Sequence, residues 1–432
     1  MAKNREAVKR ALQMASMTAG VTGSYLGYFA QRIFLDENAR QRALKQTHAK
    51  AGRRMTARMA KLRGPAMKLG QTLSLQAGLL PDEALAELTS LQMSAPPMHA
   101  SLVRAMFRAE FSREPEQMFK QFAIEPFAAA SLGQVHKAVT KNGQAVAVKV
   151  QYPAIREAIK ADFSWFRTAS KPAQWSKHLP PEVLDELERQ FLEETDYRVE
   201  ANNTAFLRKK LKPLLYVEVP QIFPDYSSER VLTMSLLQGM HLDTFLATKP
   251  SQALRDKIGE RVFELYYFQV LKVEAFHADP HWGNYLFRSD GTIGLVDFGC
   301  VKRLSPEFAA NLRAMYLYPG SSESAGFQRL LEQRYRMFGN RLNQSTRRAL
   351  VRFVETFYRK VYPPEREKEH LAIDFADAAF IREYMRQATN LANSRGATPE
   401  CVFLSRAETG LYHSLHRLQA RVHTSAIVRR WQ

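Results

Sequence analysis

Cysteine is scarce in this sequence, with two thiols, Cys300 and Cys401, among 432 residues. Two thiols cannot form a disulfide framework, and a structural zinc site would depend mainly on histidines. Acidic residues are also too few to balance the basic ones, since 43 Asp and Glu face 62 Lys and Arg and leave a net charge of +19. These shortages indicate a reducing, cytoplasmic compartment and an anionic partner such as nucleotide phosphate, acidic lipid headgroups or nucleic acid.

Much of the positive charge lies near the N-terminus. Residues 1–63 hold 14 basic and 3 acidic side chains, a net +11 (14 − 3). The uncharged stretch Ala11–Gln31 is long enough to span a bilayer, but polar residues occur throughout it, and no other apolar run reaches 18 residues. We therefore expect no transmembrane helix. We predict a helix that lies on its own domain or on the inner face of an anionic membrane, with no nucleic acid bound.

Changes in hydrophobic period divide the chain into four predicted parts. They are a basic helical segment (1–60), a helical extension (61–120), a small β-rich lobe (121–240) and a larger helical lobe (241–432). The predicted strands are Phe127–Val139, Ala145–Val150, Tyr216–Phe223, Arg230–Leu237 and Ile293–Val296. Asn142-Gly143 predicts a hairpin between the first two strands, and one helix is expected over Pro181–Leu211. The fold class is therefore α+β, with two lobes and a helical N-terminal extension.

A dense group of polar residues lies in the helical lobe, within His277-Ala-Asp279-Pro-His281-Trp-Gly-Asn284. Packing alone does not explain it, because each buried polar group needs a partner. Phosphoryl transfer explains this group of residues, because the reaction requires a carboxylate to orient or deprotonate the nucleophile and two oxygen ligands for a divalent metal. Asp279 suits the first role, and Asn284 follows it by five residues. Asp297, in Asp-Phe-Gly after a predicted strand, is the second metal ligand.

A lysine occupies the second strand of the predicted hairpin, in Val146-Ala-Val-Lys149. An ammonium group in an alternating apolar strand is costly unless it is paired, and kinases use such a lysine to bind the α and β phosphates. Two candidates for the pair, Glu194 and Glu200, lie on the helix predicted to follow. They are six residues apart and so point to different faces, which means that one pairs with Lys149 and the other makes a second contact.

Two further segments are placed to contact a nucleotide. The stretch before the lysine strand has alanine at two positions where a glycine-rich loop, Gly-x-Gly-x-x-Gly-x-Val, has glycine. The added Cβ atoms restrict φ and take up room above the phosphates, so we expect a stiffer loop. Its contact residues are Ala128, Ala129, Ala130, Ser131, Gly133 and Val135. In the N-terminal extension, Lys68 and Gln71 of Lys-Leu-Gly-Gln lie at i and i+3 on one helical face.

Together these segments resemble the UbiB-type, AarF-domain atypical kinases. The resemblance covers residues 60–305 and depends on six motifs in one order: Lys-x-Gly-Gln, the alanine loop, Val-Ala-Val-Lys, Glu-x-Asp-Tyr with Glu-Ala-x-Asn, His-x-Asp-Pro-x-x-x-Asn and Asp-Phe-Gly. It implies a protein-kinase-like fold in which Asp279 takes the catalytic position. Asn284 and Asp297 would then be the metal ligands.

The same resemblance implies the remaining roles and ligands. Lys149 would pair with Glu194 or Glu200, while Lys68 and Gln71 would cover the nucleotide cleft. The implied cofactors are ATP or ADP with Mg²⁺, which Mn²⁺ can replace. The implied partners are a quinone or prenyl-lipid precursor, an anionic lipid surface, proteins of lipid biosynthesis and, as an option, a second copy in a homodimer. The implied activity is that of an atypical kinase or ATPase that assists ubiquinone or prenyl-lipid biosynthesis.

The sequence is also compatible with other functions. Small-molecule phosphotransferases have a similar catalytic loop, although Lys-x-Gly-Gln is not expected ahead of their β lobe. A nucleotide-sensing scaffold without catalysis would explain the alanine loop. A zinc enzyme using His277 and His281 is less favoured, because Pro280 disrupts the helix that would align them. Protein substrates are disfavoured, because no Ala-Pro-Glu segment follows Asp297.

Overall fold

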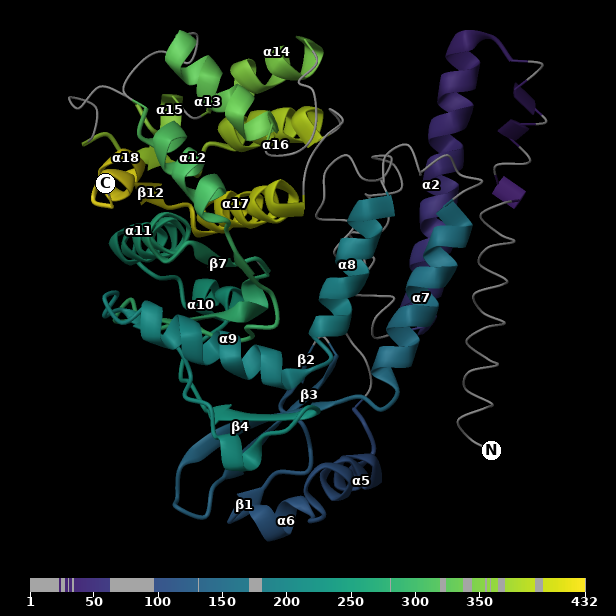
Figure 1. Cartoon of the computed structure of the whole chain (residues 1–432), viewed down its shortest axis with the longest axis vertical. Helices are drawn as coiled ribbons and strands as arrows, with labels where there is room; N and C mark the ends of the chain where they lie inside the picture. The colour runs from purple at the N-terminus through teal and green to yellow at the C-terminus, as the bar shows by residue number, and fades with distance from the viewer. Residues whose placement is uncertain are drawn as a thin grey trace. The chain divides into compact units, whose positions relative to one another are not determined.

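A computed structural model of the chain (Figure 1) forms two compact units, residues 1–198 with 223–234, and residues 199–222 with 235–432. Helix α9 (Tyr197–Lys210) begins in the first unit and continues in the second. The structure describes residues 23–24, 28–29, 31–32, 35–62, 97–130, 132–170, 181–279, 281–318, 324–336, 344–353, 356–357, 359–363, 370–392 and 399–431. The predicted domain boundaries at residues 60, 120 and 240 stay predictions.

A five-stranded sheet is the centre of the first unit. Its order is β1-β3-β4-β6, and β2 pairs with β3. The strands are β1 (Gln121–Phe122), β2 (Ala128–Ala130), β3 (Gly133–Val139), β4 (Ala145–Gln151) and β6 (Val231–Ser235). The helices are α2 (Glu37–Leu62), α5 (Ala100–Phe111), α6 (Pro115–Met118), α7 (Ile155–Ser170) and α8 (Pro181–Glu193). Strands β3 and β4 are antiparallel, and Gly143 takes φ +82° in their turn, which confirms the hairpin predicted from Asn142-Gly143.

The prediction of a single strand over Phe127–Val139 is wrong, because this segment forms two strands. Strand β2 folds back on β3, with Ala130 opposite Gly133. A Cβ on Gly133 would lie 2.2 Å from the carbonyl oxygen of Val150, so glycine is what lets β3 begin this close to β4. The apolar pattern does not reveal the turn, because alanine and leucine surround it on both sides.

The alternation along β4 assigns its side chains to opposite faces of the sheet. Val146, Val148 and Val150 are fully buried and belong to one hydrophobic cluster with Phe107 of α5. Lys149 lies between them in sequence and therefore points to the other face. The packing of α5 on the valine face thus determines which face of the sheet receives the lysine.

The second unit is mostly helical and is built around α11 (Gln252–Phe268). This helix contacts α17 (Pro399–Leu418), as Figure 1 shows, and also α18 (Thr424–Arg429) and β12 (Arg421–Val422). The other helices are α10 (Leu242–Ala247), α12 (Pro306–Tyr316), α13 (Ala325–Arg336), α14 (Gln344–Phe353), α15 (Arg359–Val361) and α16 (Ala378–Ala392). None of the helices among the described residues has the length and apolar character needed to cross a membrane.

The described residues of the second unit also form three small sheets. One has the order β5-β9-β8, another pairs β7 with β10, and the third pairs β11 with β12. Their further strands are β5 (Val217–Glu218), β7 (Ala275–His277), β8 (Tyr285–Phe287), β9 (Ile293–Leu295), β10 (Val301–Arg303) and β11 (Ile373–Asp374). The predicted strands at 216–223, 230–237 and 293–296 are therefore confirmed as the shorter β5, β6 and β9. The predicted α+β class is confirmed as well.

We expect Gly133→Ala to lower the free energy of unfolding by roughly 1–3 kcal/mol, because the added Cβ displaces β3 from β4. Thermal and denaturant unfolding would measure the loss. Gly294→Ala is the matched control, since its Cβ would meet side-chain carbons at 3.3 Å and not a backbone oxygen at 2.2 Å. An equal loss in both variants would contradict the close approach as the cause.

Candidate functional site

The predicted catalytic loop joins β7 to β8, and it brings Asp279 and Asn284 together. The side-chain amide nitrogen of Asn284 donates to Oδ2 of Asp279 at 3.1 Å and to the Asp279 carbonyl oxygen at 3.2 Å. Asn284 is buried at the end of a 3₁₀ turn (Trp282–Asn284). Because its nitrogen is used in these bonds, its amide oxygen is the atom that can ligate a metal.

The backbone turns sharply at Asp297, two residues after β9 ends at Leu295. Asp297 has φ +72°, a left-handed conformation that costs a non-glycine residue roughly 1–2 kcal/mol. Its Oδ1 accepts from the Gly299 amide at 3.1 Å, and its carbonyl oxygen accepts from Nε2 of His277. Strain of this kind persists where the surroundings fix the backbone, and it is common at functional sites.

Two side chains of α9 hold the residue that follows Asp297. The Phe298 amide donates to the Glu200 carboxylate at 3.2 Å, and the Asn203 side chain donates to the Phe298 carbonyl oxygen at 3.1 Å. Glu200 is buried. The predicted Glu200 is therefore a backbone anchor of the Asp-Phe-Gly segment, while its pairing with Lys149 stays a prediction.

An arginine that sequence reasoning missed, Arg406 of α17, contacts the predicted catalytic carboxylate. Its guanidinium donates to Oδ1 of Asp279 at 2.7 Å, and its side chain is 6% exposed. The positive charge and the hydrogen bond both favour the ionised form of Asp279. The sequence signal that could have identified it is an arginine next to Ala407 and nearly one turn after Phe403, both of which are buried, where a charged side chain needs a partner.

A buried hydroxyl network fixes α17 close to this contact. Glu408, two residues after Arg406, accepts hydrogen bonds from Tyr267 at 3.0 Å and Tyr316 at 3.3 Å. Tyr267 and Tyr362 also share a hydrogen bond, and burial raises the pKa of both tyrosines well above its usual range. Residues two apart on a helix point about 200° apart by its geometry, so α17 is held by Glu408 on one side and presents Arg406 on the other.

The predicted nucleotide-binding lysine lies in the first unit. Lys149 is buried, and its ammonium group lies 5.4 Å from the centroid of the Tyr197 ring. The strand register places Ala128 opposite Val135 and Val135 opposite Lys149. Directly opposed residues share a face of the sheet, so these three predicted residues form one row across β2, β3 and β4.

The remaining predicted loop residues follow the same register. Ala130 pairs with Gly133, and Ala129 points to the opposite face of β2. Ser131, Lys68 and Gln71 lie outside the described residues.

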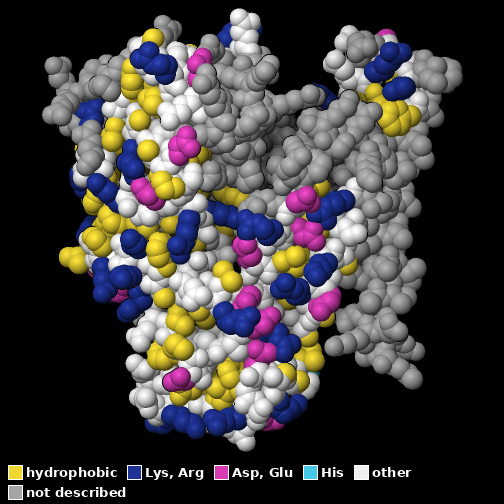
Figure 2. All heavy atoms as spheres, viewed as in Figure 1, with side chains coloured by type: hydrophobic (Ala, Val, Ile, Leu, Met, Phe, Trp, Pro, Cys, Tyr) yellow, Lys and Arg dark blue, Asp and Glu magenta, His cyan; other side chains and the backbone are white. Residues whose placement is uncertain are grey.

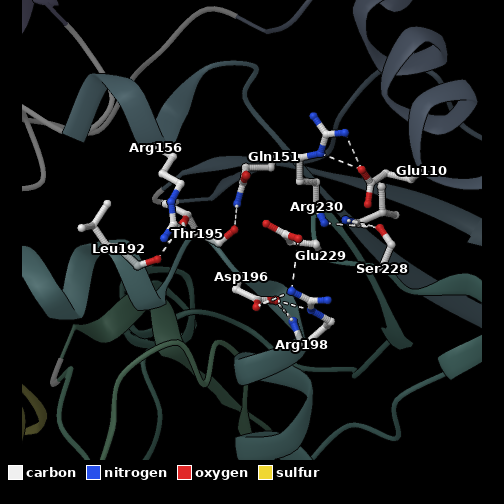
Figure 3. Close-up of polar contacts among 11 residues, drawn as sticks. Glu110, Gln151, Arg156, Leu192, Thr195, Asp196, Arg198, Ser228, Glu229 and Arg230 are labelled. Atoms are coloured by element: carbon white, nitrogen blue, oxygen red, sulfur yellow. Dashed lines mark hydrogen bonds and ion pairs between the residues drawn. The ribbon is translucent and has the colours of Figure 1, made fainter. Parts of the chain in front are cut away.

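The prediction of one continuous helix over Pro181–Leu211 is wrong, because the chain turns between α8 and α9 at residues 194–196. The side-chain amide of Gln151 donates to the Thr195 carbonyl oxygen at 3.0 Å, as Figure 3 shows. Oδ1 of Asp196 accepts from the Arg198 amide at 3.0 Å, the bond of a helix N-cap. These bonds end α8 and begin α9. Glu194, which is buried, is thus in the turn, while Glu200 is in the helix.

The residues present fit a magnesium–nucleotide site better than a zinc site. Among the described residues, no group of three His, Cys, Asp or Glu side chains is placed to hold a metal, so His277 and His281 lack a third protein ligand. Mg²⁺ needs fewer protein ligands, because phosphate oxygens and water complete its shell. One asparagine oxygen and one carboxylate, from Asn284 and Asp297, are such a set.

Comparisons with known proteins identify a kinase-like family. Residues 90–328 match the model of the ABC1 atypical kinase-like domain. Protein ACTIVITY OF BC1 COMPLEX KINASE 7 of Arabidopsis thaliana is 35% identical over 54% of this chain and 34% of its own length. The atypical kinase COQ8 of Saccharomyces cerevisiae is 28% identical over 87% of this chain and 74% of its own. The probable protein kinase UbiB of Pseudomonas fluorescens is 34% identical over 58% of this chain and 49% of its own length.

One solved structure supports the fold. The complex of Rv3197 with erythromycin from Mycobacterium tuberculosis has a TM-score of 0.58 and 24% identity, and it covers 85% of this chain and 92% of that one. For the first curated relatives, by contrast, the chain spans 34–42% of their length.

We expect Arg406→Met to lower the free energy of unfolding by about 2–4 kcal/mol, because it leaves the Asp279 carboxylate without its buried cation. Adding Asp279→Asn should restore part of this loss, so that the double variant is more stable than the sum of the single losses predicts. Unfolding in denaturant would measure all three variants. Arg386→Met, which removes an exposed pair with Glu383, is the control and should change little. Additive losses would contradict the coupling.

Proposed function

Because the chain belongs to the ABC1 atypical kinase-like family, as the match over residues 90–328 shows, we propose that it binds a magnesium complex of ATP or ADP and catalyses phosphoryl transfer or ATP hydrolysis. The observation that carries the proposal is the geometry of Asn284, whose amide nitrogen is bonded to Asp279 and whose oxygen remains for a metal. The aligned row of Ala128, Val135 and Lys149 supports it as the nucleotide-binding face.

The proposed roles follow from the chemistry of each side chain. The Asn284 oxygen and the Asp297 carboxylate would hold Mg²⁺, which neutralises phosphate charge when it is bound. Lys149 would bind the α and β phosphates through its ammonium group. Ala128 and Val135, beside it on the same face of the sheet, would offer apolar contact to the nucleotide.

Asp279 is better suited to orient an acceptor than to remove its proton. Arg406 stabilises the negative charge of this carboxylate, and a carboxylate stabilised in that way is a weaker base. Phosphoryl transfer through a loose transition state depends mainly on positioning and electrostatics, so orientation is sufficient. Water and small alcohols are the acceptors that we favour over proteins.

We also propose that this activity assists ubiquinone or prenyl-lipid biosynthesis at a membrane. The support is the resemblance to UbiB-type kinases, together with the identity to the probable protein kinase UbiB and the atypical kinase COQ8. A nucleotide-sensing scaffold is the second candidate, because a buried arginine bound to Asp279 would also suit a site that binds nucleotide without turnover.

We expect Asp297→Asn to abolish Mg²⁺-dependent release of ADP from ATP, because one metal ligand loses its charge. Lys149→Met should weaken the binding of ATP by at least about tenfold, since phosphate loses a cationic contact. A coupled assay for ADP and calorimetric titration with ATP and Mg²⁺ would measure the two effects. Asp225→Asn, an exposed substitution in the first unit, is the control for the loss of a carboxylate.

Asp279→Asn separates catalysis from sensing. If the chain is an enzyme, turnover falls by at least about a hundredfold while nucleotide binding persists, because Asp279 orients the acceptor rather than the phosphates. If the chain is a scaffold, Asp279→Asn restores function in cells as well as the unaltered chain does, and Lys149→Met does not. Turnover in Asp297→Asn equal to that of the unaltered chain would overturn the enzyme proposal.

A further inference from the structure

The C-terminal end of α9 and the turn after it form a basic surface with one fully exposed apolar residue. We infer that this surface, the α9 tip (Arg208, Lys209, Lys210, Lys212 and Leu215), docks on an anionic lipid membrane, with Leu215 entering the interface. The inference deepens the membrane-associated role proposed above by naming the surface that makes the contact.

The charge of the α9 tip has one sign. Residues 201–217 contain four basic residues and no acidic residue. All four basic side chains are exposed. Within the described part of the chain, no carboxylate lies within 4 Å of the ammonium groups of Lys209, Lys210 or Lys212, so these charges are available to an external anion.

Arg303 adds a fifth cation to the same surface, beside the aromatic ring of Phe206. The ring of Phe206, one turn before Lys210 on α9, has the Lys210 ammonium at 5.9 Å and the Arg303 guanidinium at 4.5 Å from its centroid. Cations near the face of an aromatic ring are attracted to it, so Phe206 keeps both charges at this end of the helix. Arg303 is itself exposed.

Leu215 is held outward by an ordered turn. Its neighbours Leu211 and Leu214 are buried, and the Leu214 amide donates to the Leu211 carbonyl oxygen at 2.9 Å. The Val217 amide then donates to the Leu214 carbonyl oxygen, also at 2.9 Å. With both flanks fixed in this way, Leu215 is 94% exposed. Figure 2 shows Lys and Arg side chains beside hydrophobic ones at the left edge, where Figure 1 places this end of α9.

The combination favours a lipid surface over other anions. A single exposed leucine is ordinary on a protein surface and would mean nothing alone. Basic residues around an exposed apolar side chain, however, match an interface in which headgroups are anionic and the layer below is apolar. Nucleic acid would use the cations but offers no comparable contact to a projecting leucine.

The test is binding of the full chain to vesicles of phosphatidylcholine alone and of phosphatidylcholine mixed with phosphatidylglycerol. We expect binding to the mixed vesicles to fall about fivefold for each lysine neutralised, so on the order of a hundredfold for the triple change of Lys209, Lys210 and Lys212 to Gln. Leu215→Ser should lower binding about tenfold, by the loss of apolar burial. Cosedimentation would measure both effects.

The matched control removes the same charge elsewhere, through the triple change of Arg113, Lys120 and Lys141 to Gln, all exposed in the first unit. Equal losses in both triple variants would overturn the assignment, because net charge alone would then explain binding. Equal binding to both vesicle types would overturn it too. Unchanged binding of Leu215→Ser would contradict the proposal that Leu215 enters the membrane interface. Binding of ATP without vesicles should be the same in every tip variant, so failure of this inference is distinguishable from failure of the proposed function.

Discussion

The ion pair between Asp279 and Arg406 joins the β7–β8 loop to a helix more than a hundred residues later in the chain. A guanidinium group with so little exposure is stable only beside a carboxylate, and removal of either partner leaves a poorly solvated charge. The stability of the loop and that of α17 are therefore coupled. Glu408 and its tyrosines on the other side of α17 give that helix a second fixed point, so the geometry around Asp279 depends on the helical core of the second unit.

The Asp-Phe-Gly segment shows the same principle in the backbone. Its left-handed residue, Asp297, is held by His277 from β7, and the next residue, Phe298, is held on both backbone polar groups by Glu200 and Asn203 of α9. Three side chains from two elements thus compensate one strained residue. A carboxylate fixed in this way would need little reorganisation in the proposed metal site, which is how a preorganised site lowers the barrier of a reaction.

The sequence predicts those features that depend on local chemistry. Asn-Gly predicts the β3–β4 turn, and the five-residue spacing predicts that Asp279 and Asn284 meet, because both follow from short stretches of chain. The break between α8 and α9 has one local signal, the N-cap residue Asp196, but the bond from Gln151 to Thr195 that holds the turn joins residues 44 apart and cannot be predicted from spacing. Arg406 was missed for the same reason: its partner is 127 residues away, and an arginine on a helix usually faces water.

The assignment of Glu200 also shows why spacing alone leaves roles open. Six residues separate Glu194 from Glu200, and on one continuous helix they would point to different faces. In the folded chain they belong to different local structures, a turn and the first turn of α9, so the helical argument does not apply to them. Burial of both carboxylates implies that each must be compensated. For Glu200 the hydrogen bond from the Phe298 amide does part of this, and it ties the residue to the Asp-Phe-Gly segment.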